Sequence, residues 1–574
     1  MISSQQSVKR RRPTIQQAPM NVVALPPGAF GIDRAHRHVI LAASLGTVFE
    51  WYDFFLYGSL AALISRQFFA GVNDTTAFIL ALLTFAAGFA VRPFGALIFG
   101  RLGDLVGRKR TFLITILIMG TTTGLVGILP TYATLGLGAP AALVCLRIMQ
   151  GLAIGGEYGG AAIYVAEHAP PRKRGLYTSW IQTTGTLGLL LSLSVILTCR
   201  SLFGADFERW GWRVPFLASV LLLAISVYIR LQLTESPVFQ EMVAAGTRSK
   251  APVRESFGSW SNLRLVLLGL FGATAGATVI WYGGQFYSLF FLSQVLKLDA
   301  QAANLLIAAA LVLGAPLLVI VGAISDRIGR KPVFVLGCAL AAASYFPVFH
   351  GITHYANPAM EQAAERAPVA VISDPDGCSF QFDPIGRKRF VRSCDIAKAA
   401  LARAGVPYST EVGSARSLAV VRIGQATGSP ALIESFEGEP MNAEQFKLAS
   451  ERFASVLHRA LSAAGYPAKA DPARINYPVV LLLLLLLMVY VALAYGALGA
   501  WLVELFPPRI RYTSMSVTYH IGVGWFGGFL PTVAFSLVAI TGDMYSGLWY
   551  PVVVATASAL IGALFVPETA RQRP

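Results

Sequence analysis

The sequence predicts an all-α polytopic membrane protein, with twelve transmembrane helices in two six-helix repeats and a small α+β exterior insertion between spans 9 and 10. Three observations support this fold class: the composition, the length of the apolar runs and a motif that occurs twice. Of the 574 residues, 55% are hydrophobic and 13% are charged, whereas soluble proteins carry about 25% charged residues. The net charge of +16 does not indicate nucleic-acid binding, because many basic residues lie in short loops between the apolar runs.

The apolar runs are close to the roughly 20 residues that a helix needs to cross about 30 Å of hydrocarbon. Backbone groups in lipid must be hydrogen-bonded within their own segment, so these runs are expected to be helices. Lys and Arg gather in one set of short loops, which places that set and both termini in the cytoplasm. The expected spans are 38–64, 76–100, 110–130, 140–167, 175–198, 212–232, 263–293, 301–324, 332–352, 477–503, 512–540 and 547–567.

The motif that occurs twice is a loop of glycines, an aspartate and basic residues. Its two copies contain Gly100, Asp104, Gly107 and Arg108, and Gly322, Asp326, Gly329 and Arg330. The two aspartates are 222 residues apart, whereas a second matching pair, Glu167 and Glu504, is separated by 337. The second half therefore holds an insertion of about 115 residues between these landmarks.

The insertion is visible directly, because residues 355–476 are polar and interrupt the membrane pattern. Short β-like runs at 368–372 and 417–423, and a helical stretch from about 442 to 464, predict a small α+β domain. It follows span 9, so we expect it outside the membrane, in the periplasm or extracellular space. The other expected units are a cytoplasmic tail at 1–37, the N-terminal six-helix bundle at 38–232, a cytoplasmic linker at 233–262, the two parts of the C-terminal bundle at 263–354 and 477–567, and a cytoplasmic tail at 568–574.

Five cysteines are scattered over the chain without a C-x-x-C motif, so we expect neither a metal site nor a bound cofactor. Cys378 and Cys394 are the only two in the insertion. An exterior domain faces an oxidising compartment, where disulfides persist, so these two are expected to form one. Pro384 and Gly386 between them favour a turn that brings the two segments together.

Polar residues inside the expected spans are the candidates for chemistry. Glu50 and Asp53 share one face of span 1, and Tyr57 continues it. A carboxylate near the membrane midplane is costly and usually marks an ion or proton path. The alternative is a permanent salt bridge that only orders the bundle. The expected basic partners are Arg92 in span 2 and Arg147 in span 4.

Other span residues are less specific. Gln150 shares the face of Arg147, and Glu157 is a second candidate proton site. Tyr282 and Gln285 in span 7 either line a substrate cavity or simply pack with their polar ends hydrogen-bonded. We expect His520 in span 11 to be a hydrogen-bonded core residue rather than a proton carrier.

The duplicated loops are predicted to act as a conformational latch at the cytoplasmic face. Their glycines let two helix ends approach, and Asp104 with Arg108, like Asp326 with Arg330, offers a breakable charge pair. The aspartate is also expected near the N-terminus of the following helix, where the dipole favours it. Topology-setting charge explains the basic residues of these loops but not the repeated spacing of Gly and Asp.

The duplicated loop resembles the signature of the major facilitator superfamily. Within that superfamily, further segments resemble the metabolite:proton symporters, a group that includes transporters of proline and betaine, shikimate, 2-oxoglutarate and citrate. They are Phe49–Tyr57, Arg92–Gly95, Gln150–Gly151, Gly155–Tyr158, Trp210–Pro215, Glu235–Pro237 and Tyr512–Ser514. The resemblance implies the major facilitator fold and uptake driven by a proton gradient, with Glu50, Asp53, Arg92, Arg147 and Glu157 as the central polar set.

We therefore expect a monomeric secondary transporter of the inner (plasma) membrane, and not an enzyme. It would take up a small organic acid or zwitterionic metabolite with protons by alternating access. No phosphate-binding loop of an ATP-driven pump occurs in the sequence. The alternatives are a receptor or sensor that uses the exterior domain, and a uniporter or exporter built on the same fold.

Overall fold

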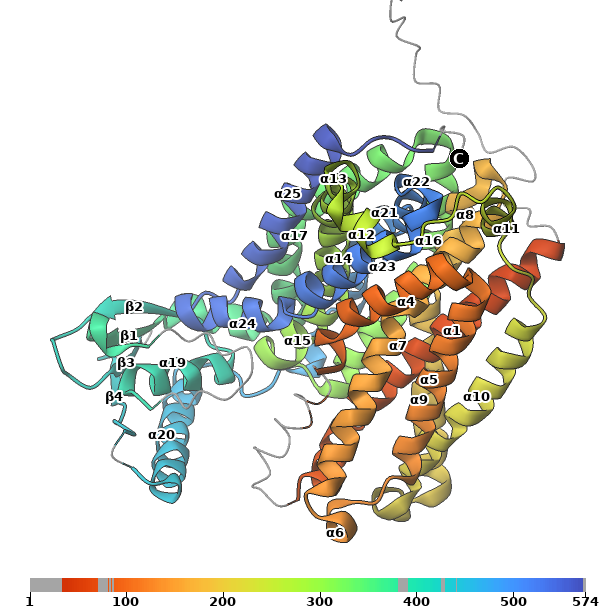
Figure 1. Ribbon diagram of the computed structural model, residues 1–574. Helices are drawn as coiled ribbons and strands as arrows, with labels where there is room; N and C mark the ends of the chain where they lie inside the picture. Colours follow the sequence, from red (N-terminus) through yellow and green to blue (C-terminus); the bar gives the residue numbers. More distant parts are fainter. Residues whose placement is uncertain are drawn as a thin grey trace, which may run out of the picture.

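Long apolar helices form most of the molecule (Figure 1). The computed structural model describes residues 34–70, 81, 84, 87–379, 391–424, 429–439 and 441–570. In this part of the chain, eleven helices are long and apolar enough to cross a membrane. The second expected span, 76–100, lies partly outside the described residues, and its described end belongs to α4 (Arg92–Val106). With this qualification the predicted fold class is confirmed.

The helices of the first half are close to the expected spans. They are α1 (Arg34–Ser59), α2 (Ala61–Phe68), α4, α5 (Arg108–Ile128), α6 (Tyr132–Leu135), α7 (Gly138–His168), η1 (Pro171–Lys173), α8 (Arg174–Gln182), α9 (Thr184–Phe203), η2 (Phe207–Gly211) and α10 (Arg213–Leu231). Two short helices, α11 (Pro237–Ala244) and α12 (Pro252–Gly258), form the linker. Both begin at a proline, which suits the first helical turn because its missing N–H would be unpaired there.

The second half begins with a span that alternates α-helix and π-helix. Wider π turns occur at η3 (Leu270–Thr274), η4 (Gly283–Tyr287) and η5 (Phe291–Val295), and such turns are frequent at functional sites. The other helices of this half are α13 (Trp260–Gly269), α14 (Ala275–Tyr282), α15 (Ser288–Phe290), α16 (Ala300–Ile328), α17 (Arg330–Ala356), α21 (Tyr477–Tyr495), α22 (Leu498–Leu505), η8 (Pro508–Ile510), α23 (Arg511–Ile521), η9 (Gly522–Gly527), α24 (Leu530–Thr541), η10 (Ser546–Leu548) and α25 (Trp549–Phe565).

Glycines of α7 allow it to lie close against α4 and the segment before it. A Cβ atom on Gly151 would lie 2.2 Å from the carbonyl oxygen of Gly88, and one on Gly155 would lie 2.4 Å from that of Arg92. Small residues permit this kind of backbone approach between membrane helices. The close contact fixes the position of Arg92 on α4 relative to the polar face of α7.

The insertion is a small α+β domain, as predicted. Its sheet has the order β2-β1-β3-β4. The β1 strand (Val369–Ser373) pairs in parallel with β2 (Tyr408–Val412) and antiparallel with β3 (Val420–Ile423), which pairs antiparallel with β4 (Ala431–Glu434). The domain's helices and turns are α18 (Pro358–Arg366), η6 (Pro375–Gly377), α19 (Ser393–Ala404), α20 (Ala443–Ala463) and η7 (Pro472–Arg474).

The expected β-runs correspond to β1 and β3, and the expected helix to α20. Asn442 and Gln445 begin α20 with a reciprocal capping box. The domain has its own core, in which Val371, Leu401 and Val421 are completely buried.

The insertion domain is attached to the second half of the membrane bundle (Figure 1). The backbone N–H of Tyr408 donates to the carbonyl of Gly542 at the end of α24, over 2.9 Å. Lys297, in the loop between η5 and α16, donates to the carbonyl of Arg403 over 2.5 Å, and its own carbonyl accepts from the N–H of Ala470. The domain thus holds the C-terminal ends of span 7 and span 11.

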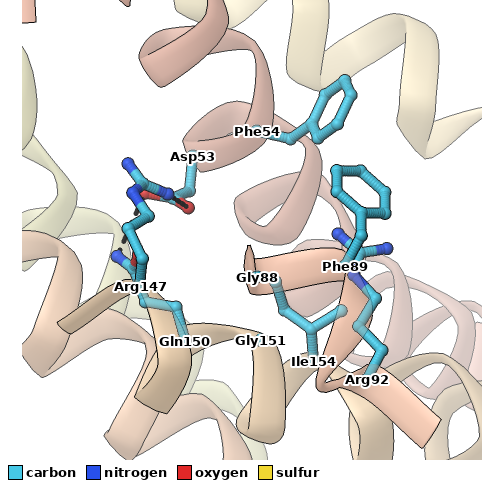
Figure 2. A pocket seen from close by; sticks show the side chains of 9 residues that line it. All are labelled: Asp53, Phe54, Gly88, Phe89, Arg92, Arg147, Gln150, Gly151 and Ile154. Carbon is cyan, nitrogen blue, oxygen red and sulfur yellow. Dashed lines mark hydrogen bonds and ion pairs between the residues drawn. The ribbon is translucent and has the colours of Figure 1, made fainter. Parts of the chain in front are cut away.

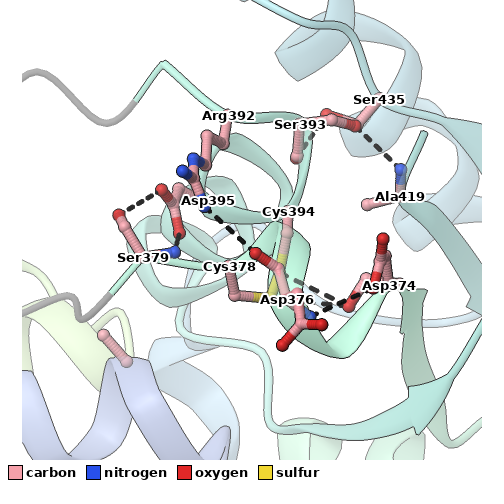
Figure 3. The surroundings of a disulfide bond; sticks show 12 residues. Asp374, Asp376, Cys378, Ser379, Arg392, Ser393, Cys394, Asp395, Ala419 and Ser435 are labelled. Carbon is pink, nitrogen blue, oxygen red and sulfur yellow. Dashed lines mark hydrogen bonds between the residues drawn. A yellow bond between two sulfur atoms is a disulfide. The ribbon is translucent and has the colours of Figure 1, made fainter. Parts of the chain in front are cut away.

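Cys378 and Cys394 form a disulfide with their Cα atoms 5.2 Å apart (Figure 3). Asp395 beside it is buried and accepts hydrogen bonds from the backbone N–H and the hydroxyl of Ser379. The bond therefore joins the segment after η6 to the first turn of α19. Most of the turn expected between the cysteines, 380–390, lies outside the described residues.

We predict that denatured, unreduced protein yields a peptide linking Cys378 to Cys394 by mass spectrometry. Cys145, Cys199 and Cys338, which are unpaired in the structure, should be alkylated in the same sample and serve as the internal control. A bridge that closes a loop of this length contributes about 3 kcal/mol to stability in the chain-entropy model. The paired substitution of both cysteines by serine should therefore lower the unfolding temperature of the insertion domain. Alkylation of both cysteines without reductant would contradict the bridge.

Candidate functional site

Asp53 is the centre of a closed polar network inside the first half. Arg147 on α7 donates to its Oδ2 over 2.9 Å, and Thr123 on α5 donates to its Oδ1 over 3.1 Å. Gln150 donates to Thr123 over 2.8 Å and more weakly to Asp53. The ring of Tyr57 lies 3.8 Å below the guanidinium of Arg147, which adds a cation–π contact. The predicted pairing of Asp53 with Arg147 is therefore direct and well coordinated.

Glu50 makes a much looser pair, one helical turn toward the N-terminus of α1. Its nearest contact with Arg92 on α4 is 3.7 Å, which is beyond hydrogen-bonding distance. Both side chains are nevertheless buried. The guanidinium of Arg92 also lies 4.1 Å from the ring centre of Phe89, and its Nε has no hydrogen-bond partner among the described residues. Glu50 and Arg92 are thus a buried ion pair that does not satisfy its members.

A small cavity lies between these two pairs (Figure 2). Asp53, Arg147 and Gln150 lie on one side of it and Arg92 on the other. Its remaining lining comes from Phe54, Gly88, Phe89, Gly151 and Ile154. The cavity lining therefore combines charged and amide groups with apolar side chains.

Glu157, like Glu50, is not among the residues that line this cavity. It forms a buried ion pair with Arg230 at the last turn of α10 and accepts from the hydroxyl of Thr115 over 2.9 Å. Arg230 also donates to the carbonyl of Phe112 and lies 3.4 Å from its ring. Arg230 cannot be recognised from the sequence, because a position near the end of span 6 is equally typical of a topology-setting arginine.

The second half contributes aromatic and neutral polar groups to the centre. Trp281 contacts Trp51 of α1, with ring centres 5.2 Å apart, and Phe286 contacts Phe54 and Phe55. These five residues form what we call the aromatic seam between α1 and span 7. Tyr282 stacks on Phe286, whereas Gln285 lies against Met488 of α21 rather than in the cavity lining.

His520 differs from its expected role. It is completely buried on α23, yet neither ring nitrogen has a hydrogen-bond partner among the described residues. It lies on a helix that packs against α4 and α7 of the first half. The sequence shows only a histidine in an apolar span, so it does not reveal that the ring lacks the expected partner.

The first duplicated loop joins the two halves between the end of α4 and the start of α23. Asp104 forms an ion pair with Arg108 at 2.9 Å, as predicted. Its carboxylate also accepts from the N–H groups of Tyr512 and Thr513 at the start of α23, over 3.2 and 2.9 Å. The backbone N–H groups that it binds thus belong to α23 of the other half and not to the following helix. Gly107 turns the chain with φ 119°, and the N–H groups that begin α5 bond Glu235 instead.

The second loop repeats this arrangement from the opposite half. Asp326 pairs with Arg330 at 2.7 Å and accepts from the N–H groups of Gly175 and Leu176 at the start of α8, each over 2.8 Å. Gly329 has φ 115°, and Glu568 bonds the first N–H groups of α17. Gly100 and Gly322 let the two halves approach closely. A Cβ atom on Gly100 would overlap Thr513, and one on Gly322 would overlap Ser179.

Two glutamates complete the latches, and both belong to the second repeated pair. Glu167 contacts Arg108 at 3.7 Å and Arg511 of the other half at 3.0 Å. Glu504 contacts Arg330 at 3.2 Å and Arg174 of the other half at 3.9 Å. The two repeated motifs therefore form one network in each half. Their separation in the sequence hid this connection.

Comparison with known families and proteins agrees with this architecture. The family model described as "Sugar (and other) transporter" matches residues 39–261, and the one described as "MFS/sugar transport protein" matches residues 169–363. A proline/betaine transporter of Salmonella typhimurium is 36% identical over 54% of this chain and 64% of its own length. The chain thus spans less than two thirds of that relative. The shikimate transporter of Escherichia coli is 36% identical over 56% of this chain and 74% of its own length.

Solved structures share the fold. The proton:xylose symporter XylE matches with a TM-score of 0.59 over 93% of this chain and 96% of its own. The sequence identity of 17% limits that likeness to the fold. The duplicated latch, the helical architecture and the identity to the shikimate transporter lead to the same assignment. The chain belongs to the major facilitator superfamily of transporters, in its metabolite:proton symporter family.

Proposed function

We propose that this protein takes up a small metabolite carrying a carboxylate, either an organic acid or a zwitterion, together with protons. The observation that carries the proposal is the contrast between the two central ion pairs. Asp53 and Arg147 are tightly coordinated, whereas Glu50 and Arg92 are buried but separated by 3.7 Å. A buried pair held this loosely leaves its desolvation largely uncompensated, so each partner can gain by binding something else.

Each member of the loose pair has a natural alternative partner. A substrate carboxylate can bind the fork of the Arg92 guanidinium in a bidentate manner. Glu50, once it loses its cation, is a buried carboxylate for which protonation removes the cost of an uncompensated charge. Binding of the substrate and of a proton then support each other, which is the coupling that a symporter requires. The names of the relatives, which include transporters of proline, betaine and shikimate, support a carboxylate-bearing substrate.

The latches and the aromatic seam supply the alternating-access part of the proposal. In this structure both latches join the halves at the proposed cytoplasmic face, and the aromatic seam joins α1 to span 7 nearer the outer face. Opening of the seam would admit substrate from outside, and opening of the latches would release it inside. The protein would then be a multi-pass protein of the inner membrane, with both termini in the cytoplasm and the insertion domain outside.

Neutralisation of Glu50 tests proton coupling. In proteoliposomes with an imposed proton gradient, Glu50→Gln should exchange labelled L-proline or shikimate but should not concentrate it, because Gln cannot bind and release a proton. Asp53→Asn should also abolish accumulation, since it frees Arg147. Glu208→Gln at the exposed outer surface is the matched control. Concentrative uptake by both central variants would show that coupling resides elsewhere, and exchange without proton coupling in the wild type would indicate a uniporter.

Neutralisation of Asp104 or Asp326 tests the latches. Each aspartate accepts two cross-interface backbone hydrogen bonds, and charged hydrogen bonds of this kind are worth about 1.5–3 kcal/mol each. Asp104→Asn should therefore shift the population toward the inward-open state and reduce turnover more than substrate affinity, as measured by cytoplasmic cysteine labelling and transport kinetics. Asp299→Asn is the control, because Asp299 bonds N–H groups of its own helix only. Loss of binding with an unchanged conformational balance would refute the latch.

Labelling from outside the cell tests the orientation. In a chain whose three unpaired cysteines are replaced by serine, Lys447→Cys on α20 should react with a membrane-impermeant maleimide in whole cells. Lys250→Cys in the linker should react only after the membrane is permeabilised. Both positions are exposed in the structure, so the reverse pattern would invert the proposed topology.

A further inference from the structure

His520 lies on the face of α23 that packs against the first half. Tyr512 and Ser516 precede it at intervals of four residues, which puts all three on one side of the helix. Tyr512 donates to the carbonyl of Gly156 over 2.8 Å, and Ser516 lies against Gly159, both on α7. Gly524 is the next residue in this series, and a Cβ atom on it would lie 3.4 Å from the carbonyl oxygen of Phe89. His520 therefore faces the junction of α4 and α7.

At that junction His520 lies near the central polar set. The ring of Phe89 lies 4.1 Å from the guanidinium of Arg92, which is the loosely paired member of the central set. The neighbouring Tyr519 stacks on Tyr158 of α7 with ring centres 3.7 Å apart. The histidine thus lies where the two halves meet, close to the charge that the proposed substrate would bind.

A buried imidazole whose ring nitrogens have no hydrogen-bond partner is energetically unfavourable. Apolar surroundings favour the neutral form of the ring, because burial penalises a charge. A neutral imidazole has one N–H donor and one acceptor nitrogen, whereas arginine has donors only. Leaving a buried polar group unpaired is unfavourable, so a partner for the ring nitrogens stabilises the site. The acceptor nitrogen of His520 can accept a hydrogen bond only from a group that carries an N–H or O–H.

We propose that His520 is a substrate-binding residue of the second half, and that it selects carboxylates with a neighbouring N–H or O–H group. Arg92 binds the carboxylate, and the unprotonated nitrogen of His520 accepts a hydrogen bond from the adjacent substituent. This inference rests on the proposed function, because it requires that Arg92 receive a substrate carboxylate. It adds a selectivity that Arg92 alone does not have: secondary amino acids and hydroxy acids bind, and fully methylated ammonium carboxylates bind more weakly.

The test compares two probes that differ in this one group. L-Proline carries N–H groups beside its carboxylate, whereas glycine betaine carries three methyl groups on the nitrogen. Transport of both is measured in proteoliposomes of the full chain, with KM and kcat determined separately. Wild type should prefer L-proline. In His520→Leu, the KM for L-proline should rise about tenfold, the loss of one hydrogen bond to a charged group, while the KM for glycine betaine stays unchanged.

Two further variants exclude a merely structural effect. His520→Gln keeps one donor and one acceptor and should retain part of the preference for L-proline. Thr518→Val is the control, because Thr518 is buried on the same helix and its hydroxyl bonds the backbone of its own helix at Ser514. It should leave both KM values unchanged. Thermal unfolding of each variant verifies folding, and His520→Leu should be no less stable than wild type.

The outcomes separate the two proposals. If wild type concentrates L-proline but His520→Leu leaves both KM values unaltered, the inference about His520 is wrong and the proposed function stands. Equal losses for both probes would give His520 a role in the site without the proposed selectivity, and would overturn the substrate class. If wild type binds neither probe nor shikimate, the carboxylate site itself is refuted, and both proposals fall together.

Discussion

The need to neutralise charge inside a bilayer governs the structure. Hydrocarbon does not solvate a carboxylate, so an acidic side chain in the bundle requires a cation or several N–H donors. Asp53 has Arg147, Glu157 has Arg230, and Asp104 has Arg108, each at hydrogen-bonding distance. Glu50 with Arg92 departs from this pattern at 3.7 Å. We therefore place the proposed exchange of partners at this pair, since an ion pair whose hydrogen bonds are satisfied gains no stability by exchanging partners.

The same requirement shapes the latches. Each consists of an aspartate, an arginine and a glutamate from one half, with a second arginine and a helix N-terminus from the other. Aligned N–H groups at a helix start act as a partial positive charge. Asp104 and Asp326 lose those donors when the halves separate, but each keeps its own arginine. Charge is thus never left bare, and the contact can open without exposing a naked carboxylate to lipid.

The sequence predicted what depends on local chemistry and failed where partners come from distant helices. Span positions, the insertion and the pairs of Asp53 and Glu50 follow from hydropathy, repeat offsets and the shortage of cations in the spans. That α23 supplies the N–H donors for Asp104, and α8 those for Asp326, depends on how the two halves dock, which no local pattern encodes. Arg230 near a helix end looked like a topology signal. His520 looked like an ordinary core residue because a sequence does not show that a ring lacks a partner.

The two halves contribute different kinds of side chain to the centre of the protein. The insertion domain, in turn, bonds only to loops and helix ends of the second half in the contacts given above. The first half holds the central charges, whereas Trp281, Tyr282 and His520 of the second half bring rings and neutral hydrogen-bonding groups. The insertion domain bonds the loop at Lys297 and the end of α24 at Gly542, both in the second half. These contacts do not cross the interface that the transport cycle must open. The insertion domain can therefore move with the second half as a rigid body. These contacts need not break when Glu50 and Arg92 exchange partners.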